Sequence, residues 1–484
     1  AAFVYLGSSG GLAPYPAWTT EGGQAYAYHG GSVTGVGDMN GDGYGEIAVA
    51  APYYDGGKED EGRVSIYRGG ANGVQATASW SFESNQAGAT FGGSIAPAGD
   101  YDRDGYADLA IGASAYRQTD PEEGIVRIYV GGPNGPPGTN LLFTGAQAYA
   151  SYGGSVSCAG DVDGDGLSDL VVGAFAFDGA HVDEGRAFLY RGVARNLRTT
   201  ASWVKDYPTR DHISQERVAC ALGDWNGDGY SDLAVGDTFH GSGVGKVDVY
   251  FGSAHGLPSA PDWTATGAGP NRFFGAHLST AGDVNGDHYE DLLISAPSFI
   301  RYDSPTNEGR VYLFFGGPNG LPASPSQELH EFGSDGFGRS IDGGGDINGD
   351  GYADIIVGEP NYDDDRGRVN VYAGSPDGVV NLLSIGMPVV GRDFFGYSVS
   401  FAGDVNGDGY DDIVAGTPLA SAGGATVGRV DLYYGGASPD RASDWHMYGT
   451  LDRGFLGYSV AGIGDVDGDG RSEFAVGSPG RGWL

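Results

Sequence analysis

The chain of 484 residues is poor in cysteine and in positive charge. Its only cysteines are Cys158 and Cys220, and no Cys-x-x-Cys pair occurs, which excludes a disulfide-stapled scaffold. They lie at corresponding points of two successive sequence units, which leaves a disulfide between them open. Arginine and lysine number 26 against 63 acidic residues, a net charge of −37. Because a protein this acidic repels phosphate backbones, we expect no nucleic-acid partner.

Long apolar runs and a leader segment are also missing. No apolar stretch of about 18 residues or more occurs, so we expect no insertion into a membrane. No signal peptide is visible, and residues 1–6 already show a strand pattern, which indicates a mature or trimmed chain.

The motifs that mark common enzyme classes are absent as well. The nine histidines are scattered, without an HExxH pair. Residues 7–11 match the nucleophile-elbow pattern formally, but they lie in a turn between two strand patterns with no helix after them. We therefore expect no catalytic residues and no enzyme activity.

Glycine, by contrast, is abundant, with 91 residues against a usual share of about 7%. Aromatic residues make up 12% of the chain, which argues against a disordered glycine-rich tract. The glycines separate short runs of alternating apolar residues, and this composition is typical of short strands joined by tight turns.

A nine-residue motif, seen in residues 404–412 as Asp-Val-Asn-Gly-Asp-Gly-Tyr-Asp-Asp, organises the chain. It has oxygen-bearing side chains at positions 1, 3, 5 and 9, the pattern of a short calcium loop. It occurs eight times, beginning at Asp38, Asp100, Asp161, Asp224, Asp283, Asp346, Asp404 and Asp465. Steps of 58 to 63 residues between the copies indicate a repeat architecture.

Each repeat contains four strand-like segments. In the second repeat these are residues 91–98, 109–113, 125–132 and 141–143, and the third segment alternates with the two-residue period of a sheet. Several fourth strands carry a tryptophan, namely Trp80, Trp203, Trp263 and Trp445. Four antiparallel strands per repeat predict the blade of an all-β propeller.

The two ends of the chain predict how the ring closes. Residues 3–7 and the region of Trp18 resemble third and fourth strands, whereas residues 456–460 and 474–477 resemble first and second strands. We therefore expect a single eight-bladed domain whose last blade combines strands from both termini. The expected blades are residues 28–82, 91–144, 152–205, 215–265, 274–330, 337–386, 395–448, and 456–484 completed by 1–20.

The residues around the motif resemble a known family. Phe395-Gly-Tyr-Ser, the acidic loop and Gly416-Thr-Pro418 are similar to the FG-GAP repeat of integrin alpha-subunit propellers and their bacterial relatives. Ala51-Pro52, Ala296-Pro297 and Ser478-Pro479 repeat the second half of this signature. Integrin-type propellers have seven blades, only some with calcium loops, whereas this chain has eight units that all carry one.

The resemblance implies up to eight Ca²⁺ ions, each bound by side chains at positions 1, 3, 5 and 9 and by the carbonyl at position 7. The implied ligands are Asp38, Asn40, Asp42, Tyr44 and Glu46; Asp100, Asp102, Asp104, Tyr106 and Asp108; Asp161, Asp163, Asp165, Leu167 and Asp169; Asp224, Asn226, Asp228, Tyr230 and Asp232; Asp283, Asn285, Asp287, Tyr289 and Asp291; Asp346, Asn348, Asp350, Tyr352 and Asp354; Asp404, Asn406, Asp408, Tyr410 and Asp412; and Asp465, Asp467, Asp469, Arg471 and Glu473. In the fifth loop His288 replaces the glycine at position 6, where we expect a positive φ and a weaker site.

Because the eight loops are alike, we interpret their calcium as structural and expect ligand choice in the loops between second and third strands, on the opposite face. Recurring acid-glycine ends in these loops suggest a structural closure, with Arg63, Arg186 and Arg310 as nearby partners. Features that do not recur are better candidates for ligand contacts. They are residues 298–307, Tyr53-Tyr54, Tyr116-Arg117, Phe175, Phe177, residues 361–363 and Asn271-Arg272.

The sequence thus predicts a calcium-stabilised binding or adhesion propeller that is secreted or on a cell surface. We expect a monomer with a protein or carbohydrate ligand. A carbohydrate-binding lectin, or a polysaccharide-active enzyme with a site near the central channel, stays open as an alternative. The enzyme would need a non-recurring cluster near the axis, and no clear one is visible. The fourth unit lacks the Phe-Gly start (residues 217–222) and the Ala-Pro end, which leaves a relaxed or a specialised blade open.

Overall fold

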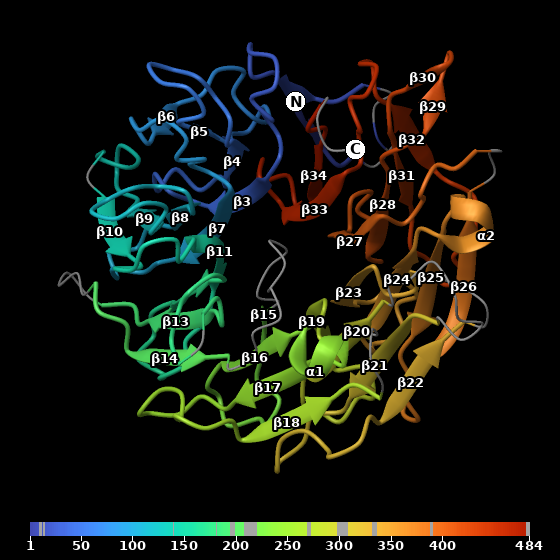
Figure 1. The fold of residues 1–484 in the computed structure, drawn as a ribbon. Helices are drawn as coiled ribbons and strands as arrows, with labels where there is room; N and C mark the ends of the chain where they lie inside the picture. The colour runs from blue at the N-terminus through green and yellow to red at the C-terminus, as the bar shows by residue number, and fades with distance from the viewer. Residues whose placement is uncertain are drawn as a thin grey trace.

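Eight four-stranded antiparallel sheets surround a central opening in the computed structural model of the chain (Figure 1). The prediction of an all-β, eight-bladed propeller is confirmed. The structure describes residues 1–8, 12, 15–138, 140–180, 182–193, 199–207, 220–268, 273–297, 308–331, 336–387 and 391–480.

The strands follow the ring in chain order. The first four blades contain β3 (Val33–Gly37), β4 (Glu46–Ala51), β5 (Arg63–Tyr67) and β6 (Trp80–Glu83); β7 (Ser94–Gly99), β8 (Asp108–Ala113), β9 (Ile125–Tyr129) and β10 (Asn140–Thr144); β11 (Tyr152–Cys158), β12 (Leu170–Ala174), β13 (Arg186–Tyr190) and β14 (Trp203–Asp206); and β15 (Cys220–Gly223), β16 (Asp232–Asp237), β17 (Lys246–Tyr250) and β18 (Trp263–Thr266). Blades five to seven contain β19 (Leu278–Gly282), β20 (Asp291–Ala296), β21 (Arg310–Phe314) and β22 (Gln327–His330); β23 (Ser340–Gly345), β24 (Asp354–Glu359), β25 (Arg368–Ala373) and β26 (Val380–Gly386); and β27 (Ser398–Gly403), β28 (Asp412–Thr417), β31 (Arg429–Tyr433) and β32 (Trp445–Tyr448). Short helices α1 (His240–Gly243) and α2 (Tyr362–Asp365) and the hairpin β29 (Ser421–Ala422) with β30 (Ala425–Thr426) lie in loops between second and third strands.

The eighth blade is built from both ends of the chain. Its strand order is β2 (Trp18–Thr20), β1 (Ala2–Tyr5), β34 (Glu473–Gly477) and β33 (Ser459–Gly464). The closing pair is antiparallel, with Val4 opposite Ala475. Figure 1 shows both termini in this part of the ring. The predicted closure is therefore confirmed. It pairs strand edges whose backbone N–H and C=O groups would otherwise face solvent.

The apolar core lies between blades. Each of the eight buried apolar clusters in the described part of the chain joins two neighbouring blades. Successive residues of β28 show the reason, because Ile413 and Ala415 pack toward blade six while Val414 packs toward blade eight. The two-residue period of a strand thus places alternate side chains in different cores. Second strands are consequently buried along their whole length and are almost entirely apolar.

The Phe-Gly pair precedes the first strand rather than starting it. Phe91 is fully buried in the cluster between blades one and two, while β7 begins only at Ser94. Gly92 has a φ of 90°, and a Cβ at this residue would lie 2.7 Å from Cγ2 of Val64. A glycine is therefore required where the chain turns close against the neighbouring blade.

Blade four departs from the repeat. Helix α1 follows β16, as α2 follows β24 in blade six, and Asp237 stands at the position of Ala51 and Ala296, the alanines of Ala-Pro in blades one and five. Residues 217–219 lie outside the described residues, as do the side chain of Cys220 and the candidate ligand loop 298–307 with Asn271-Arg272. Cys158 is a free cysteine, so it forms no disulfide with Cys220. Within the described residues, no helix has the length and apolar character needed to cross a membrane.

Replacing Phe474 by alanine should weaken the closing blade. Phe474 is fully buried, and its ring stacks on Tyr5 with 5.2 Å between ring centroids, so it joins the two terminal segments directly. Loss of a buried phenylalanine costs about 3–5 kcal/mol of unfolding free energy. Chemical denaturation measures this, and Val380→Ala, at a residue that is 58% exposed, is the control with a change within about 0.5 kcal/mol. Equal losses in the two variants would contradict the assignment.

Acid should destabilise the same region through His29. This side chain is 4% exposed and its Nε2 lies 3.3 Å from Oγ1 of Thr20 in the closing blade. Burial lowers the pKa of His29 to about 3, and the Ala1 amine and Arg63 add to the shift. The unfolded chain therefore binds more protons below its ordinary pKa of about 6.5, and stability falls as the pH drops from there toward 3.

Between pH 6.5 and 5 this loss amounts to about 2 kcal/mol. Thermal or urea unfolding of the wild type and of His29→Gln, both in excess calcium, measures it as the difference between their pH dependences. Identical pH dependences of the two proteins would show that His29 is not the titrating group.

Candidate metal centres and the opposite loop face

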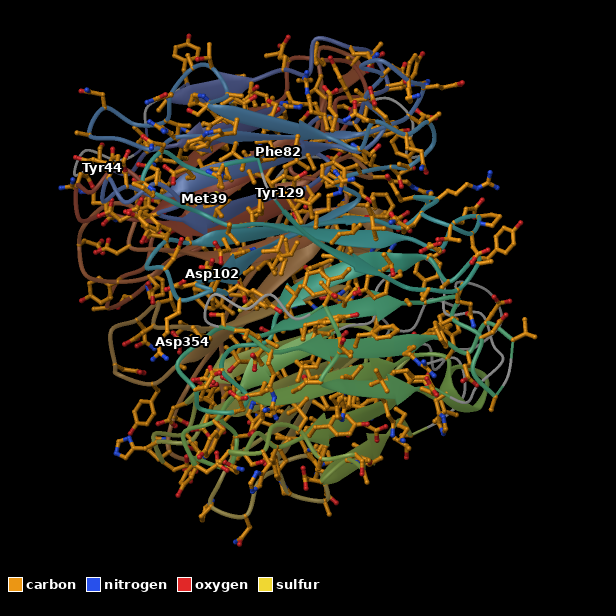
Figure 2. The ribbon with its side chains drawn as sticks, turned by 90° about the vertical axis from the view of Figure 1, so that its left-hand side faces the viewer. Met39, Tyr44, Phe82, Asp102, Tyr129 and Asp354 are labelled. Carbon is orange, nitrogen blue, oxygen red and sulfur yellow. The ribbon has the colours of Figure 1, made fainter. Side chains whose placement is uncertain are left out.

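The forty predicted ligand residues lie in the loops between first and second strands and, for most ninth positions, at the first residue of the second strand. Figure 2 shows Tyr44, Asp102 and Asp354, from three different blades, on the same side of the molecule. In the seventh loop, Oδ1 of Asp404 accepts backbone hydrogen bonds from Gly407 (2.7 Å) and Asp408 (3.0 Å), and Oδ2 accepts one from Gly409 (2.8 Å). The chain therefore wraps around its first carboxylate.

The fifth loop keeps this wrap although it lacks the second glycine. His288 has a φ of 73°, close to the 91° of Gly409 at the same position, so the predicted left-handed backbone is confirmed. Its N–H donates to Oδ2 of Asp283 at 2.8 Å, as the glycine does elsewhere. The imidazole itself is exposed, with Nδ1 3.8 Å from the same carboxylate oxygen.

The acid at position 9 has a second role that the sequence did not indicate. In Asp412, which is fully buried, Oδ2 accepts the N–H of Val405 in the loop, and Oδ1 accepts the N–H of Gly435 after the third strand, both at 2.9 Å. Asp108, Asp169, Asp232, Asp291, Asp354 and Glu473 make the same pair of bonds. One carboxylate thus ties the loop to the strand-three turn, and each oxygen keeps a further lone pair for a cation.

These buried acids are electrostatically costly without a counter-charge. Burial raises the pKa of Asp412 to about 7, against two backbone donors that lower it, and Asp408 and Asp404 raise it further. The pKa of the ninth-position acid is about 7 in every loop, for the same main reason. Like charges this close favour either protonation or a bound cation.

Three loops bring carboxylate oxygens of positions 1, 3 and 9 within 4.8 Å of one another. They are Asp100, Asp102 and Asp108; Asp161, Asp163 and Asp169; and Asp465, Asp467 and Glu473. These are the loops with aspartate at position 3. In the others an asparagine takes that place, and in loop seven Asn406 bonds to Asp408 through both ends of its amide. An all-oxygen donor set fits a hard cation.

Neighbouring loops also bind one another. The tyrosine at position 7 lies over the glycine at position 4 of the preceding loop, and a Cβ on Gly164 would lie 2.5 Å from Cε1 of Tyr230. Gly468 and Tyr44 make this contact across the closure of the ring. Two pairs of loops differ: Arg103 replaces the glycine where the next loop has Leu167 instead of tyrosine, and Arg471 takes the place of the tyrosine against Gly407.

In the third loop, an arginine side chain would compete with a metal ion for one of the predicted ligands. Nη1 of Arg191 lies 2.8 Å from Oδ2 of Asp163, whose side chain is only 7% exposed. Burial raises the pKa of Asp163, whereas Arg191 lowers it. The guanidinium thus occupies one carboxylate oxygen of the predicted ligand set.

On the opposite face, most aromatic candidates for ligand contacts are occupied by arginines of their own blade. The guanidinium of Arg63 lies 3.7 Å from the ring centroid of Tyr54. The same stacking joins Arg186 to Phe177, Arg368 to Tyr362 and Arg127 to Tyr116, at 3.9, 3.9 and 5.7 Å. These rings therefore support the blade, and their interpretation as ligand contacts is not favoured.

The prediction that arginines pair with the acids at the acid-glycine ends of these loops is only partly confirmed. Arg310 pairs with Glu308 at 3.9 Å, as expected. Arg186, however, pairs with Asp206 of β14. The acids instead accept backbone bonds of their own loop, as Glu123 does from Thr119 (2.8 Å) and Asp120 (2.7 Å).

Sequence comparison finds known proteins that are similar to this chain. The human phosphatidylinositol-glycan-specific phospholipase D is 34% identical over 222 residues, which cover 41% of this chain and 26% of that protein. Integrin alpha-PS2 of Drosophila melanogaster is 34% identical over 209 residues (40% and 14%), and integrin alpha-5 of Xenopus laevis 32% over 245 residues (47% and 21%). The matches span less than a third of these relatives.

The sequence model of the FG-GAP repeat matches residues 30–67, 91–129, 153–190, 274–314, 337–374, 395–433 and 456–482. These segments lie in every blade except the fourth, which is the blade that departs from the repeat in structure. They cover more than half of the chain, and this extent shows that the protein belongs to the FG-GAP repeat family.

Proposed function

We propose that this protein is a calcium-stabilised extracellular binding propeller, secreted or on a cell surface, that recognises a protein or glycan ligand through the face opposite its metal loops. The observation that carries the proposal is a structural difference between the two faces of the ring. One face repeats the same oxygen-rich loop eight times, whereas the other differs from blade to blade.

The residues present fit calcium. Positions 1, 3, 5 and 9, exemplified by Asp404, Asn406, Asp408 and Asp412, would supply side-chain oxygens, and Tyr410 its carbonyl. A bound Ca²⁺ would supply two positive charges to these clustered acids and so reduce their mutual repulsion. The chain's own part is to hold these oxygens in place through the backbone bonds to Asp404 and Asp412.

A structural role for these ions follows from where the loops lie. Most loops contact the next through the tyrosine–glycine stack, and several also through a backbone bond, such as Ser472 N–H to Asp404 O at 2.9 Å. A metal ion that orders one loop therefore also orders an interface between blades. We assign the ions no catalytic task, because the protein oxygens are committed to holding them.

An extracellular location is supported by the loop type. Calcium loops of modest affinity need the calcium concentrations found outside the cytoplasm. The relatives named as integrin alpha subunits carry the same repeat. The strongly acidic chain also gives no support for binding to nucleic acid or to anionic lipid.

The names of the relatives do not agree on one activity for this chain. One group is named as a phospholipase D and another as integrin alpha subunits, and these two relatives match 41% and 40% of this chain. We therefore assign no enzyme activity. A glycan array and a capture experiment with extracellular protein ligands test the binding function, and turnover of a polysaccharide panel by the intact protein would support an enzyme instead.

Chelation should lower the melting temperature strongly. An ion that binds only the folded state stabilises it by about 2.7 kcal/mol per site at a free concentration of 100 Kd. Loss of several such sites should lower the Tm by more than about 10 °C. Differential scanning calorimetry with EDTA measures this, with calcium-saturated EDTA as the matched control and re-added calcium as the reversal. An unchanged melt would refute the calcium assignment.

Asp404→Ala should remove one calcium ion and weaken one blade. The substitution deletes a predicted ligand and the acceptor of three backbone bonds. Calorimetric calcium titration should show one site fewer, whereas Asp377→Ala, an exposed acid outside the loops, should keep the full number. Loss of several ions together would mean that neighbouring sites are coupled, and no loss would contradict the assigned site.

A further inference from the structure

A hollow of about 390 Å³ lies among the first strands at the centre of the ring. Strands β3, β7, β11, β19 and β23, which contribute to its wall or lead into it, surround the opening in Figure 1. Its lining includes Gly31, Gly93 and Gly154, the serine after each of them, and His277. The volume falls in the range of about 300–1,000 Å³ typical of small-molecule sites.

The residue after the Phe-Gly pair breaks the symmetry of this region. The first three blades have glycine there, namely Gly31, Gly93 and Gly154, whereas blades six to eight have Arg339, Tyr397 and Tyr458. At this position the first three blades thus have bare backbone, whereas blades six to eight carry large side chains with polar ends, which adjoin the hollow through His277. Because the residue at this position differs between blades, the fold of a blade does not require a particular side chain there.

The large side chains form one connected cluster with His277. Nη1 of Arg339 lies 3.3 Å from Nε2 of His277, and Nη2 of Arg339 donates to Oη of Tyr397 at 3.3 Å. The guanidinium also lies 4.9 Å from the Tyr397 ring centroid, and the rings of Tyr397 and Tyr458 are 5.3 Å apart. Since arginine keeps its proton, Nε2 of His277 accepts and the imidazole is neutral.

His277 stands where the other described blades have a serine. In Ser94, Ser340 and Ser398 the hydroxyl donates to the carbonyl of a glycine in the next blade, at 2.8, 3.0 and 3.0 Å. This bond joins neighbouring blades at the channel mouth. Blade five has instead an imidazole that lines the hollow and contacts Arg339 of blade six.

We propose, on the basis of the ligand-binding function assigned above, that the channel mouth binds a carboxylate-bearing saccharide. The carboxylate is held by the Arg339–His277 pair, and the sugar ring lies against Tyr397 and Tyr458. A guanidinium binds a carboxylate through parallel N–H bonds.

The walls favour a saccharide over a peptide side chain. Serine hydroxyls and backbone groups beside Gly31, Gly93 and Gly154 can exchange hydrogen bonds with several sugar hydroxyls at once. The site is a hollow rather than a flat surface, and its lining places serines, glycines and His277 beside apolar side chains such as Ile95 and Leu278. A peptide carboxylate would use the cation but leave most of these polar groups without a partner.

Isothermal titration calorimetry on the full chain in fixed excess calcium tests the proposal. The probes are short glucuronate and galacturonate oligosaccharides and the same compounds with their carboxyl groups reduced. We expect binding of at least one acidic probe and a loss of about tenfold or more on carboxyl reduction. Arg339→Gln should cause a similar loss, and Arg441→Gln, at an exposed arginine between β31 and β32, should cause none.

A second variant keeps the test valid if Arg339→Gln folds poorly. His277→Ser introduces the residue found at this place in the other described blades, so it should fold and should weaken binding severalfold. Equal affinity of the acidic probe for wild type, Arg339→Gln and His277→Ser would overturn the proposal. So would binding of an acidic peptide, but of no saccharide, that depends on Arg339.

The experiment distinguishes failure of the acidic-sugar site from failure of the broader binding function. A neutral glycan or a protein ligand that binds all three proteins equally would refute the acidic-sugar site and leave the binding function intact. No binding by the wild type on saccharide, peptide and protein panels would refute both.

Discussion

A buried carboxylate at the start of each second strand holds the metal-loop face of this propeller together. Asp412 shows the principle, because one oxygen accepts a bond from the loop before it and the other from the turn after the third strand. Burial raises its pKa to about 7 while other acids lie nearby. The same group that positions the backbone thus creates the need for a cation, so the fold and the proposed calcium dependence share one physical cause.

Contacts between loops extend this constraint around the ring. A tyrosine of one loop covers a glycine of the loop before it, and the pair Arg103 and Leu167 changes on both sides together. The apolar cores likewise join neighbours, since alternate residues of each second strand face different blades. A blade is therefore stabilised mainly by its neighbours, and the strands contributed by the two termini complete the last pair of interfaces.

The proposed recognition surface is separated from this scaffold in space. The metal-loop face repeats one loop because most loops meet the next in the same way. The opposite face tolerates differences, and the cluster around Arg339 uses this freedom to place positive charge at the mouth of an acidic ring. Several aromatic residues of that face are stacked against arginines of their own blade, so they are less favoured as ligand contacts.

The sequence by itself determined the blade count, the closure by both termini and the position of every acidic loop, because these depend on local spacing and on the two-residue period of strands. It also indicated the left-handed backbone at His288, since a glycine occupies that position in the other loops. Only the tertiary structure decided which groups meet. The second bond of Asp412, the ion pair of Arg191 with Asp163, the stack of Arg63 on Tyr54 and the contact of Arg339 with His277 join separate strands, loops or blades. Repeat spacing places whole units around a ring, but side-chain partners follow from distances across strands and blades, and one sequence without its fold does not contain those distances.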